Sequence, residues 1–401
     1  MTIATVESPF TGLRVIDADS HYSEPYDLWT SRAPAAYKDR VLRVLPNEAL
    51  GGRAYWFLGD EPIFPGGGAS FVDREGRKKT VSGMITEGDA WEDIHEASYD
   101  VDARLQLLDE LGIWAQVVYP NTIGFGAYAL LQSTDQELAR LVVEIYNDAC
   151  AEWQEAGRGR LYPQAVLPFW DIPASVREAQ RIHAMGLRGI TMAGMPHLGG
   201  LPDLGQPEWE PLYEVLQDLA LPINIHVGAT NVAHDDANGP VAWPSLGDRA
   251  VKPVNSVQME LANARFLSNL VVSDVLLKYP DLKWVSVESG VGWIPYVLER
   301  IDYEYREDIP GRPPPDRPSA LEMFKRNIYG CFWFEYAGPT KLLDYLGVDN
   351  VMWESDFPHP TCLYPSPLER TAEALAELDP VSIRKVMQDN AAKLYRIDVA
   401  P

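Results

Sequence analysis

Leu13–Asp19 reads LRVIDAD, a short apolar run that ends in acidic residues, and the rest of the chain repeats this pattern. We predict a β-strand here, because short runs rich in β-branched residues and bounded by polar or turn-forming residues are typical of strands. Seven further runs of the same kind follow. They are Trp114–Tyr119, Leu161–Leu167, Leu187–Met192, Leu221–Val227, Lys283–Glu288, Ile328–Phe334 and Asn350–Asp356.

Longer amphipathic segments separate these predicted strands and are typical of helices. They include Asp135–Glu155, Ala174–Met185, Glu208–Leu219, Gly292–Tyr305 and Val381–Tyr395. Eight strand–helix alternations in 401 residues predict an α/β fold with a parallel sheet. The number of alternations favours a closed (β/α)₈ TIM barrel over an open doubly wound sheet.

One segment interrupts the alternation between the first two predicted strands. Residues 37–100 contain the aromatic run Arg53–Phe57 and the turn-forming run Pro65–Gly68, so we expect a hairpin-like structure there. We interpret 37–100 as an insertion that forms a lid or edge subdomain within a single barrel domain spanning residues 1–401.

The composition excludes several classes of protein. Lys and Arg number 34 and Asp and Glu number 58, so the net charge of −24 argues against nucleic acid as a partner. Three cysteines without CxxC spacing favour a reduced, cytoplasmic setting. The N-terminus has no pattern of a secretory signal, and no apolar run reaches the roughly 18–20 residues that cross a bilayer. We therefore expect a cytoplasmic protein that binds neither nucleic acid nor membrane.

Polar residues end several of the predicted strands, which is where a barrel of this type places its active site. In the first strand, alternation puts Asp17, Asp19 and His21 on one face, and Glu24 can reach back from the following turn. His226 ends the fifth strand and Glu288 the sixth. A buried carboxylate at such a position is costly unless a cation compensates it.

Asp356 ends the eighth strand, and His359 follows one turn later. Together the strand ends offer seven candidate metal ligands: Asp19, His21, Glu24, His226, Glu288, Asp356 and His359. Oxygen and nitrogen ligands without a thiolate suit a hard or borderline divalent metal such as Fe, Mn or Zn. Because the set exceeds what one tetrahedral ion uses, we expect one or two metal ions per chain.

These motifs resemble the amidohydrolase superfamily, specifically the amidohydrolase-2 group related to aminocarboxymuconate semialdehyde decarboxylase. The resemblance rests on Asp17–Pro25 (DADSHYSEP), Arg104–Pro120 (RLQLLDELGIWAQVVYP), Gly186–Ile190 (GLRGI), His226, Glu288–Trp293 (ESGVGW) and Glu354–His359 (ESDFPH). It implies a distorted (β/α)₈ barrel that holds divalent metal at its strand ends. Barrels of this group commonly form homo-oligomers, so a dimer is expected, or an assembly with a paralogous subunit.

The chain also departs from the decarboxylases of this group. They usually open with His-x-His or Glu-x-His, where this chain has Asp19-Ser20-His21. They usually carry a catalytic histidine on the sixth strand, where this chain has Glu288. The carboxylate-rich set is similar to that of amidohydrolase-related dinuclear oxygenases, in which iron or manganese activates dioxygen.

Our first hypothesis is a hydrolase in which metal-activated water attacks a small organic acid or amide. Asp19, His21 and His226 are then the core ligands, and Asp356 is both a ligand and the proton acceptor. Glu24, Glu288 and His359 bind a second metal, with Glu288 and His359 also assigned catalytic roles.

Three alternatives remain open at this point. The first is a dinuclear Fe or Fe/Mn oxygenase that hydroxylates a small carboxylate-bearing substrate, and the second is a non-oxidative decarboxylase. The third is an inactive barrel that serves as the partner of an active paralogue. Three further residues are predicted to bind substrate, namely His197, His234 and Trp293.

Overall fold

Each of the eight predicted strand positions contains a β-strand in the computed structural model. The structure describes residues 8–66, 69–79, 91–125, 127–131, 133–228, 245, 248–307 and 316–400. The strands are β1 (Ile16–Tyr22), β5 (Ala115–Pro120), β6 (Leu161–Pro163), β7 (Ile190–Thr191), β8 (Ile223–His226), β9 (Trp284–Val287), β10 (Ile328–Phe332) and β11 (Val351–Trp353). β1 and β5 are as long as the predicted strands but begin later in the chain, and the other six are shorter than predicted.

The strands form two parallel sheets, β1-β5-β6 and β11-β10-β9-β8-β7, that isolated bridges join into a barrel. On one side, Ala165 bridges Ile190, which joins β6 to β7. On the other, the His21 N–H donates to the carbonyl of Phe357 (2.7 Å) and the Asp356 N–H to that of Asp19 (3.0 Å). The predicted distorted barrel is confirmed, and its last strand meets its first beside the predicted ligands.

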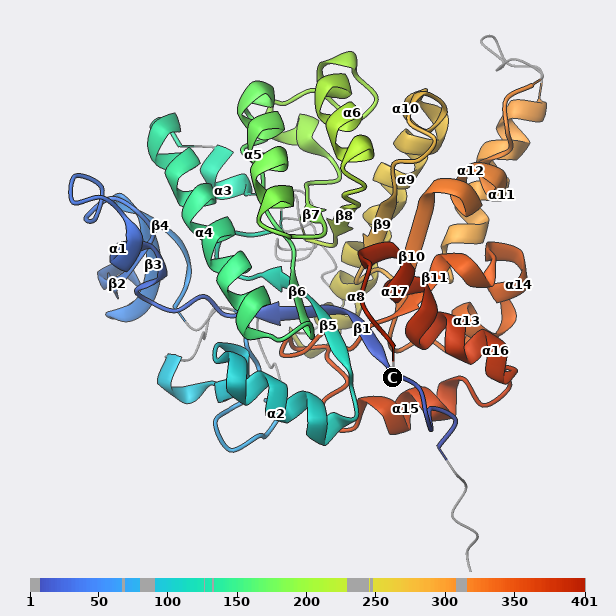
Figure 1. The fold of residues 1–401 in the computed structure, drawn as a ribbon, viewed down its shortest axis with the longest axis horizontal. Helices are drawn as coiled ribbons and strands as arrows, with labels where there is room; N and C mark the ends of the chain where they lie inside the picture. Colours follow the sequence, from blue (N-terminus) through green and yellow to red (C-terminus); the bar gives the residue numbers. More distant parts are fainter. Residues whose placement is uncertain are drawn as a thin grey trace, which may run out of the picture.

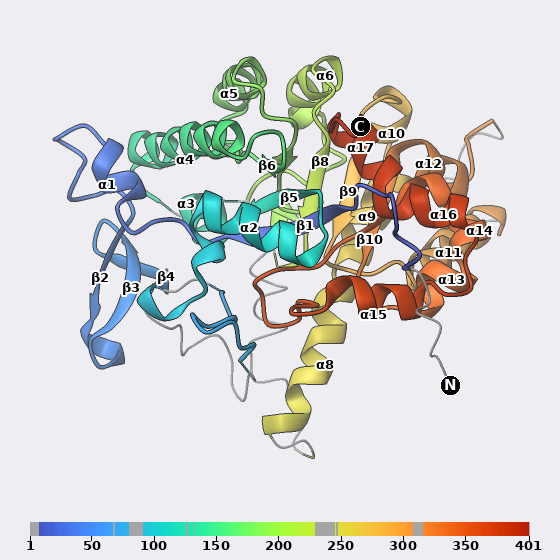
Figure 2. The same ribbon diagram turned by 60° about the horizontal axis from the view of Figure 1, so that its bottom comes forward.

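Helices surround the barrel, with α4 to α6 on one side and α11 to α14 on the other (Figure 1). The earlier helices in the chain are α1 (Leu28–Arg32), α2 (Val101–Leu111), α3 (Tyr128–Leu131), α4 (Gln136–Ala156), α5 (Ile172–Ala184), α6 (Glu210–Asp218), α8 (Asp248–Leu261), α9 (Asn263–Val272) and α10 (Val275–Lys278). The later helices are α11 (Ile294–Arg306), α12 (Ala320–Asn327), α13 (Ala337–Lys341), α14 (Leu343–Leu346), α15 (Pro367–Ala374), α16 (Pro380–Arg384) and α17 (Asn390–Tyr395). Figure 2 shows α8 projecting away from the barrel.

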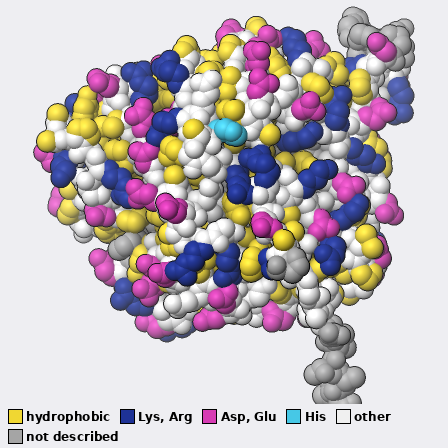
Figure 3. Space-filling view, in the orientation of Figure 1, with side chains coloured by type: hydrophobic (Ala, Val, Ile, Leu, Met, Phe, Trp, Pro, Cys, Tyr) yellow, Lys and Arg dark blue, Asp and Glu magenta, His cyan; other side chains and the backbone are white. Residues whose placement is uncertain are grey.

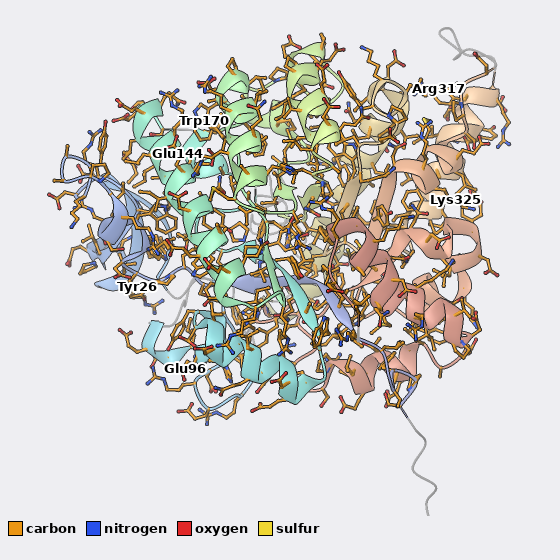
Figure 4. The ribbon with its side chains drawn as sticks, in the orientation of Figure 1. Tyr26, Glu96, Glu144, Trp170, Arg317 and Lys325 are labelled. Atoms are coloured by element: carbon orange, nitrogen blue, oxygen red, sulfur yellow. The ribbon has the colours of Figure 1, made fainter. Side chains whose placement is uncertain are left out.

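Aspartate caps explain where several of these helices begin. The side chains of Asp100, Asp135 and Asp171 accept backbone N–H groups in the first turns of α2, α4 and α5. Such caps satisfy donors that the helix itself leaves unpaired. At another helix end, Arg317 (labelled in Figure 4) donates to the carbonyls of Val271, Val272 and Ser273 at the end of α9.

The segment between β1 and β5 contains a three-stranded antiparallel sheet. Its strands are β2 (Arg43–Asn47), β3 (Arg53–Leu58) and β4 (Glu61–Pro65), and both ribbon views place them at one side of the molecule (Figures 1 and 2). Trp56 packs at 5.3 Å against Trp29 and at 5.8 Å against Tyr26, which is labelled in Figure 4. The aromatic run of β3 therefore attaches the sheet to the barrel. That the insertion acts as a lid stays a prediction.

The surface carries both signs of charge. In the face shown in Figure 3, Lys and Arg side chains are interspersed with Asp and Glu, so the acidic excess does not form one continuous patch there. Within the described part of the chain, no helix is both long enough and apolar enough to span a membrane.

Candidate metal centre

Six of the seven predicted ligands meet at the ends of β1, β8, β9 and β11. They form two overlapping groups, each with its ligating atoms within 4.8 Å of one another. The first group is Asp19, His21, His226 and Glu288, and the second is His21, Glu288, Asp356 and His359. His21 and Glu288 belong to both. All six side chains are buried.

Alternation along β1 does not hold as predicted for Asp17. The pairing of β1 with β5 shifts register between Asp17 and Ser20, so Asp19 and His21 reach the cluster while Asp17 does not. The Asp17 carboxylate instead accepts bonds from Gln116 (2.8 Å) and from the N–H and hydroxyl of Ser355 (2.7 and 2.5 Å). An irregularity of this kind changes the face to which a strand residue points.

In two of the histidines, the ring nitrogen that faces away from the centre contacts a backbone carbonyl, and this contact orients the ring. His226 Nδ1 lies 2.8 Å from the carbonyl of Val227, and His21 Nδ1 lies 3.5 Å from that of Pro120. These contacts assign the protons to Nδ1 and leave both Nε2 lone pairs facing inward, 3.2 Å apart. Two facing lone pairs repel each other unless a cation lies between them. His359 is turned the other way: its Nε2–H donates to Asn121 Oδ1 (2.8 Å), and its Nδ1 faces Asp356 (3.1 Å).

The carboxylates show the same need for a cation. Both oxygens of Asp19 and Oδ1 of Asp356 are buried without a hydrogen-bond donor among the described residues. The nearest nitrogens belong to the three histidines: His359 Nδ1 lies 3.1 Å from Asp356 Oδ1, and His21 Nε2 and His226 Nε2 lie 3.4 to 3.5 Å from these oxygens. Buried anionic oxygens without partners are costly, and a divalent cation would supply the missing partner. The residues therefore fit a divalent metal site.

Burial and neighbouring charges shift the pKa values of three residues in the cluster. Burial raises the pKa of Glu288 well above its ordinary value, and the charges of Asp356 and Asp19 raise it further. Burial, with the neighbouring His359, lowers the pKa of His21 to about 4. Burial also acts to raise the pKa of Asp356, but His359 and His21 outweigh it and hold that pKa below its usual value. Desolvation and neighbouring carboxylates therefore raise the pKa of Glu288, desolvation is the main cause for His21, and the neighbouring histidines lower the pKa of Asp356.

Backbone conformation at two ligands is unusual. Glu288 and Asp356 have φ values of 49° and 62°, in the left-handed region that non-glycine residues seldom adopt. Glu288 directly follows β9, and Asp356 lies three residues after the end of β11. Non-glycine residues in this conformation are often found at functional sites, where the surrounding structure holds them.

Glu24 is not brought into either group. Its carboxylate is buried and accepts the backbone N–H groups of Asn121 (3.1 Å) and Thr122 (2.9 and 3.1 Å). Of the residues predicted to bind substrate, His197 is exposed on the turn after β7, and His234 lies outside the described residues. Trp293 is half-buried at the start of α11, and its indole N–H donates to the carbonyl of Ser289 (2.8 Å).

Three residues that the sequence analysis did not assign contact the cluster. Asn121 holds His359, and the Thr361 hydroxyl donates to Asp356 Oδ2 (2.6 Å) and lies 3.5 Å from Glu288 Oε1. Glu354 is buried, and its Oε2 accepts the Glu288 N–H (3.3 Å). Asn121 and Glu354 directly follow strands, which is the signal that identified the ligands. Thr361 lies deeper in a loop, where no pattern marks it.

The family model described as amidohydrolase matches residues 128–397, more than half of the chain. The chain belongs to the amidohydrolase family. The matched part of this amidohydrolase contains four of the six clustered residues: His226, Glu288, Asp356 and His359. Asp19 and His21, on β1, precede it.

Solved structures with the same fold extend over nearly the whole amidohydrolase chain. An amidohydrolase from Mycobacterium avium subsp. paratuberculosis K-10 matches with a TM-score of 0.72 and 25% sequence identity, covering 96% of this chain and 99% of that chain. A 5-carboxyvanillate decarboxylase from Sphingomonas paucimobilis matches at 0.60 and 19%, covering 96% and 100%. A dihydroxybenzoic acid decarboxylase from Polaromonas sp. JS666, with bound manganese and the inhibitor 2-nitroresorcinol, matches at 0.63 and 18%, covering 96% and 98%. The two decarboxylases show the shared fold.

Proposed function

We propose that this amidohydrolase-family chain is a metal-dependent hydrolase that acts on a small organic acid or amide at two divalent cations. One observation carries the proposal: two overlapping groups of candidate ligands, in which oxygens of Asp19 and Asp356 are buried without a hydrogen-bond donor among the described residues. Glu24 is left out of the proposed ligand set, because backbone N–H groups already occupy its oxygens.

Charge balance supports two cations rather than one. Asp19, Glu288 and Asp356 carry three negative charges when ionised, which exceed the two positive charges of one divalent cation. Two cations bring the same set to a net charge of +1. A site with that net charge attracts an anionic substrate, which agrees with a small organic acid.

Divalent cations at such a site lower the pKa of a bound water to about 7 and polarise a substrate carbonyl. The protein's own part in the reaction is to hold the ligands and to accept a proton. We assign proton acceptance to the carboxylate of Asp356, whose Oδ2 accepts the Thr361 hydroxyl. His359 lies 3.1 Å from Oδ1 and, held by Asn121, fixes its position.

Non-oxidative decarboxylation is the second candidate, and the structural neighbours favour it. Of the three solved structures described above, two are decarboxylases of aromatic acids, and one of these two carries manganese. Decarboxylation requires a proton donor for the carbon that loses CO₂. If this chain is a decarboxylase, Glu288, which occupies the sixth-strand position, would have to be that donor instead of a ligand.

Metal content and gas dependence together test these functions. We expect plasma mass spectrometry of the purified protein to find two divalent ions per chain, and Glu288→Gln to reduce this number and abolish turnover. Hydrolysis should proceed under nitrogen without release of CO₂, whereas CO₂ release under nitrogen would select the decarboxylase. Turnover that needs O₂ and a reductant would instead select a dinuclear oxygenase. One metal and full activity in Glu288→Gln would contradict the two-cation site.

A further inference from the structure

The segment after β5 contacts two of the candidate ligands from one side. Asn121 Oδ1 accepts the Nε2–H of His359 (2.8 Å), and this bond leaves the Nδ1 lone pair of His359 free to bind a cation. Four residues later, the Phe125 ring stacks on the His226 ring at a centroid distance of 3.7 Å. The position of this short segment therefore decides the position of both imidazoles.

Few of the contacts that hold the segment come from its own neighbours in sequence. Thr191 on β7 donates its hydroxyl to the carbonyl of Phe125 (2.7 Å), and the Asn121 side-chain amide donates to Ser23 Oγ (3.2 Å). The remaining bonds come from Glu24, whose two oxygens accept the N–H groups of Asn121 and Thr122. Glu24 is 2% exposed, so water does not replace these bonds.

We propose that Glu24 is a positioning residue, which fixes His359 through Asn121 and His226 through Phe125. This proposal rests on the proposed metal centre, since it concerns the residues that would hold the cations. It assigns to Glu24 a role different from metal ligation. A buried carboxylate that accepts two or three backbone N–H groups holds a loop in one conformation, because those donors have no other partner.

Outer contacts of metal-binding histidines have measurable effects on affinity. Their loss typically lowers metal affinity by about 10- to 100-fold, because the ring must be ordered again on binding. Glu24 contacts the histidines only indirectly, through Asn121 and Phe125. We therefore expect the loss of metal affinity to lie at the lower end of that range. The conservative variant Glu24→Gln keeps an oxygen that can accept both N–H groups, and it should preserve the loop. A true ligand would lose its cation in the same variant.

Three variants and two measurements test the proposal. The variants are Glu24→Ala, Glu24→Gln and, as a matched control, Glu178→Ala. Glu178 is also buried and accepts a hydrogen bond from Asn147 (2.6 Å), but it lies on the outer helix α5. The first measurement is titration of the metal-free protein with Co²⁺, followed by visible absorption, which reports the ligand geometry. The second is hydrogen exchange, by mass spectrometry, of peptides that cover residues 115–125.

We expect Glu24→Ala to bind Co²⁺ about tenfold more weakly, with an altered spectrum and faster exchange over residues 121–125. Glu24→Gln should resemble the wild type in both measurements, and Glu178→Ala should lose thermal stability without a change in the cobalt spectrum. Loss of one cobalt ion in Glu24→Gln would overturn the proposal in favour of ligation. Unchanged exchange in Glu24→Ala would also overturn it. If wild-type protein binds no Co²⁺, the two-cation function fails, while the exchange result still decides the role of Glu24.

Discussion

Single residues at the centre show how the protein prepares oxygens for a cation. The hydroxyl of Thr361 occupies one oxygen of Asp356 and leaves the other without a donor. Asp19 is fully buried, and neither of its oxygens has a donor within the part of the chain that the structure describes. Unpaired buried anions destabilise a fold, so their presence is best explained by a function that uses them.

Replacing Asp356 with Ala should remove metal binding without unfolding the barrel. We expect the affinity for at least one cation to fall by more than about a hundredfold. Loss of an outer contact of a ligand lowers metal affinity by up to about that factor, and loss of the ligand itself should lower it further. In the metal-free state the variant should still fold, because the lost side chain belongs to the ligand cluster and not to the hydrophobic core. Metal analysis and thermal unfolding in chelator measure both effects. Full activity in the variant would show that the site is assigned incorrectly.

At the scale of elements, the loop between β9 and α11 depends on a distant glutamate. The carboxylate of Glu335, which follows β10, accepts the N–H groups of Val291 and Gly292, each at 2.8 Å. A Cβ atom on Gly290 or Gly292 would lie 2.8 to 2.9 Å from a Glu335 oxygen, so the approach requires glycine at both positions. The glycines of the ESGVGW motif are thus explained by a residue more than forty positions away.

Replacing Glu335 with Ala should loosen this loop and, with it, Glu288. The two N–H groups would lose a charged acceptor, and a lost hydrogen bond of this kind costs about 2 kcal/mol. We expect a lower urea midpoint together with weaker binding of the cation that Glu288 holds. Glu377→Ala serves as the control, because Glu377 is an exposed partner of Lys341 on the surface. Equal decreases in the urea midpoint and in metal affinity in both variants would argue against a specific role of Glu335.

At the scale of the whole molecule, the candidate ligands tie together strands from both ends of the chain. Asp19 and His21 come from β1, His226 from β8, and Glu288, Asp356 and His359 from β9, β11 and the loops that follow. The barrel closes between β11 and β1 only through isolated bonds such as that from His21 to Phe357. Cations bound at this junction would therefore stabilise the closure.

Chelation should consequently destabilise the protein at its closing strands. A ligand present at about 100 times its Kd stabilises the native state by about 2.7 kcal/mol, and its removal should lower the Tm accordingly. Hydrogen exchange should accelerate most in β1 and in the segment after β11, with less change in α5 and α6 on the outer surface. A Tm that is unchanged by chelator, in protein shown to contain metal, would contradict a role of the cations in closure.

The sequence by itself determined the positions of the eight strands, the helices between them and most of the candidate ligands that the structure brings together. These features depend on local periodicity, and in a parallel barrel the carboxyl ends of the strands meet at one end whatever the details of packing. The tertiary structure alone decided three other points. The register shift in β1 separates Asp17 from Asp19, the segment after β5 occupies the oxygens of Glu24, and Thr361 reaches Asp356 from a loop. The first two depend on contacts between residues far apart in the chain and the third on the conformation of a loop, and no local pattern encodes either.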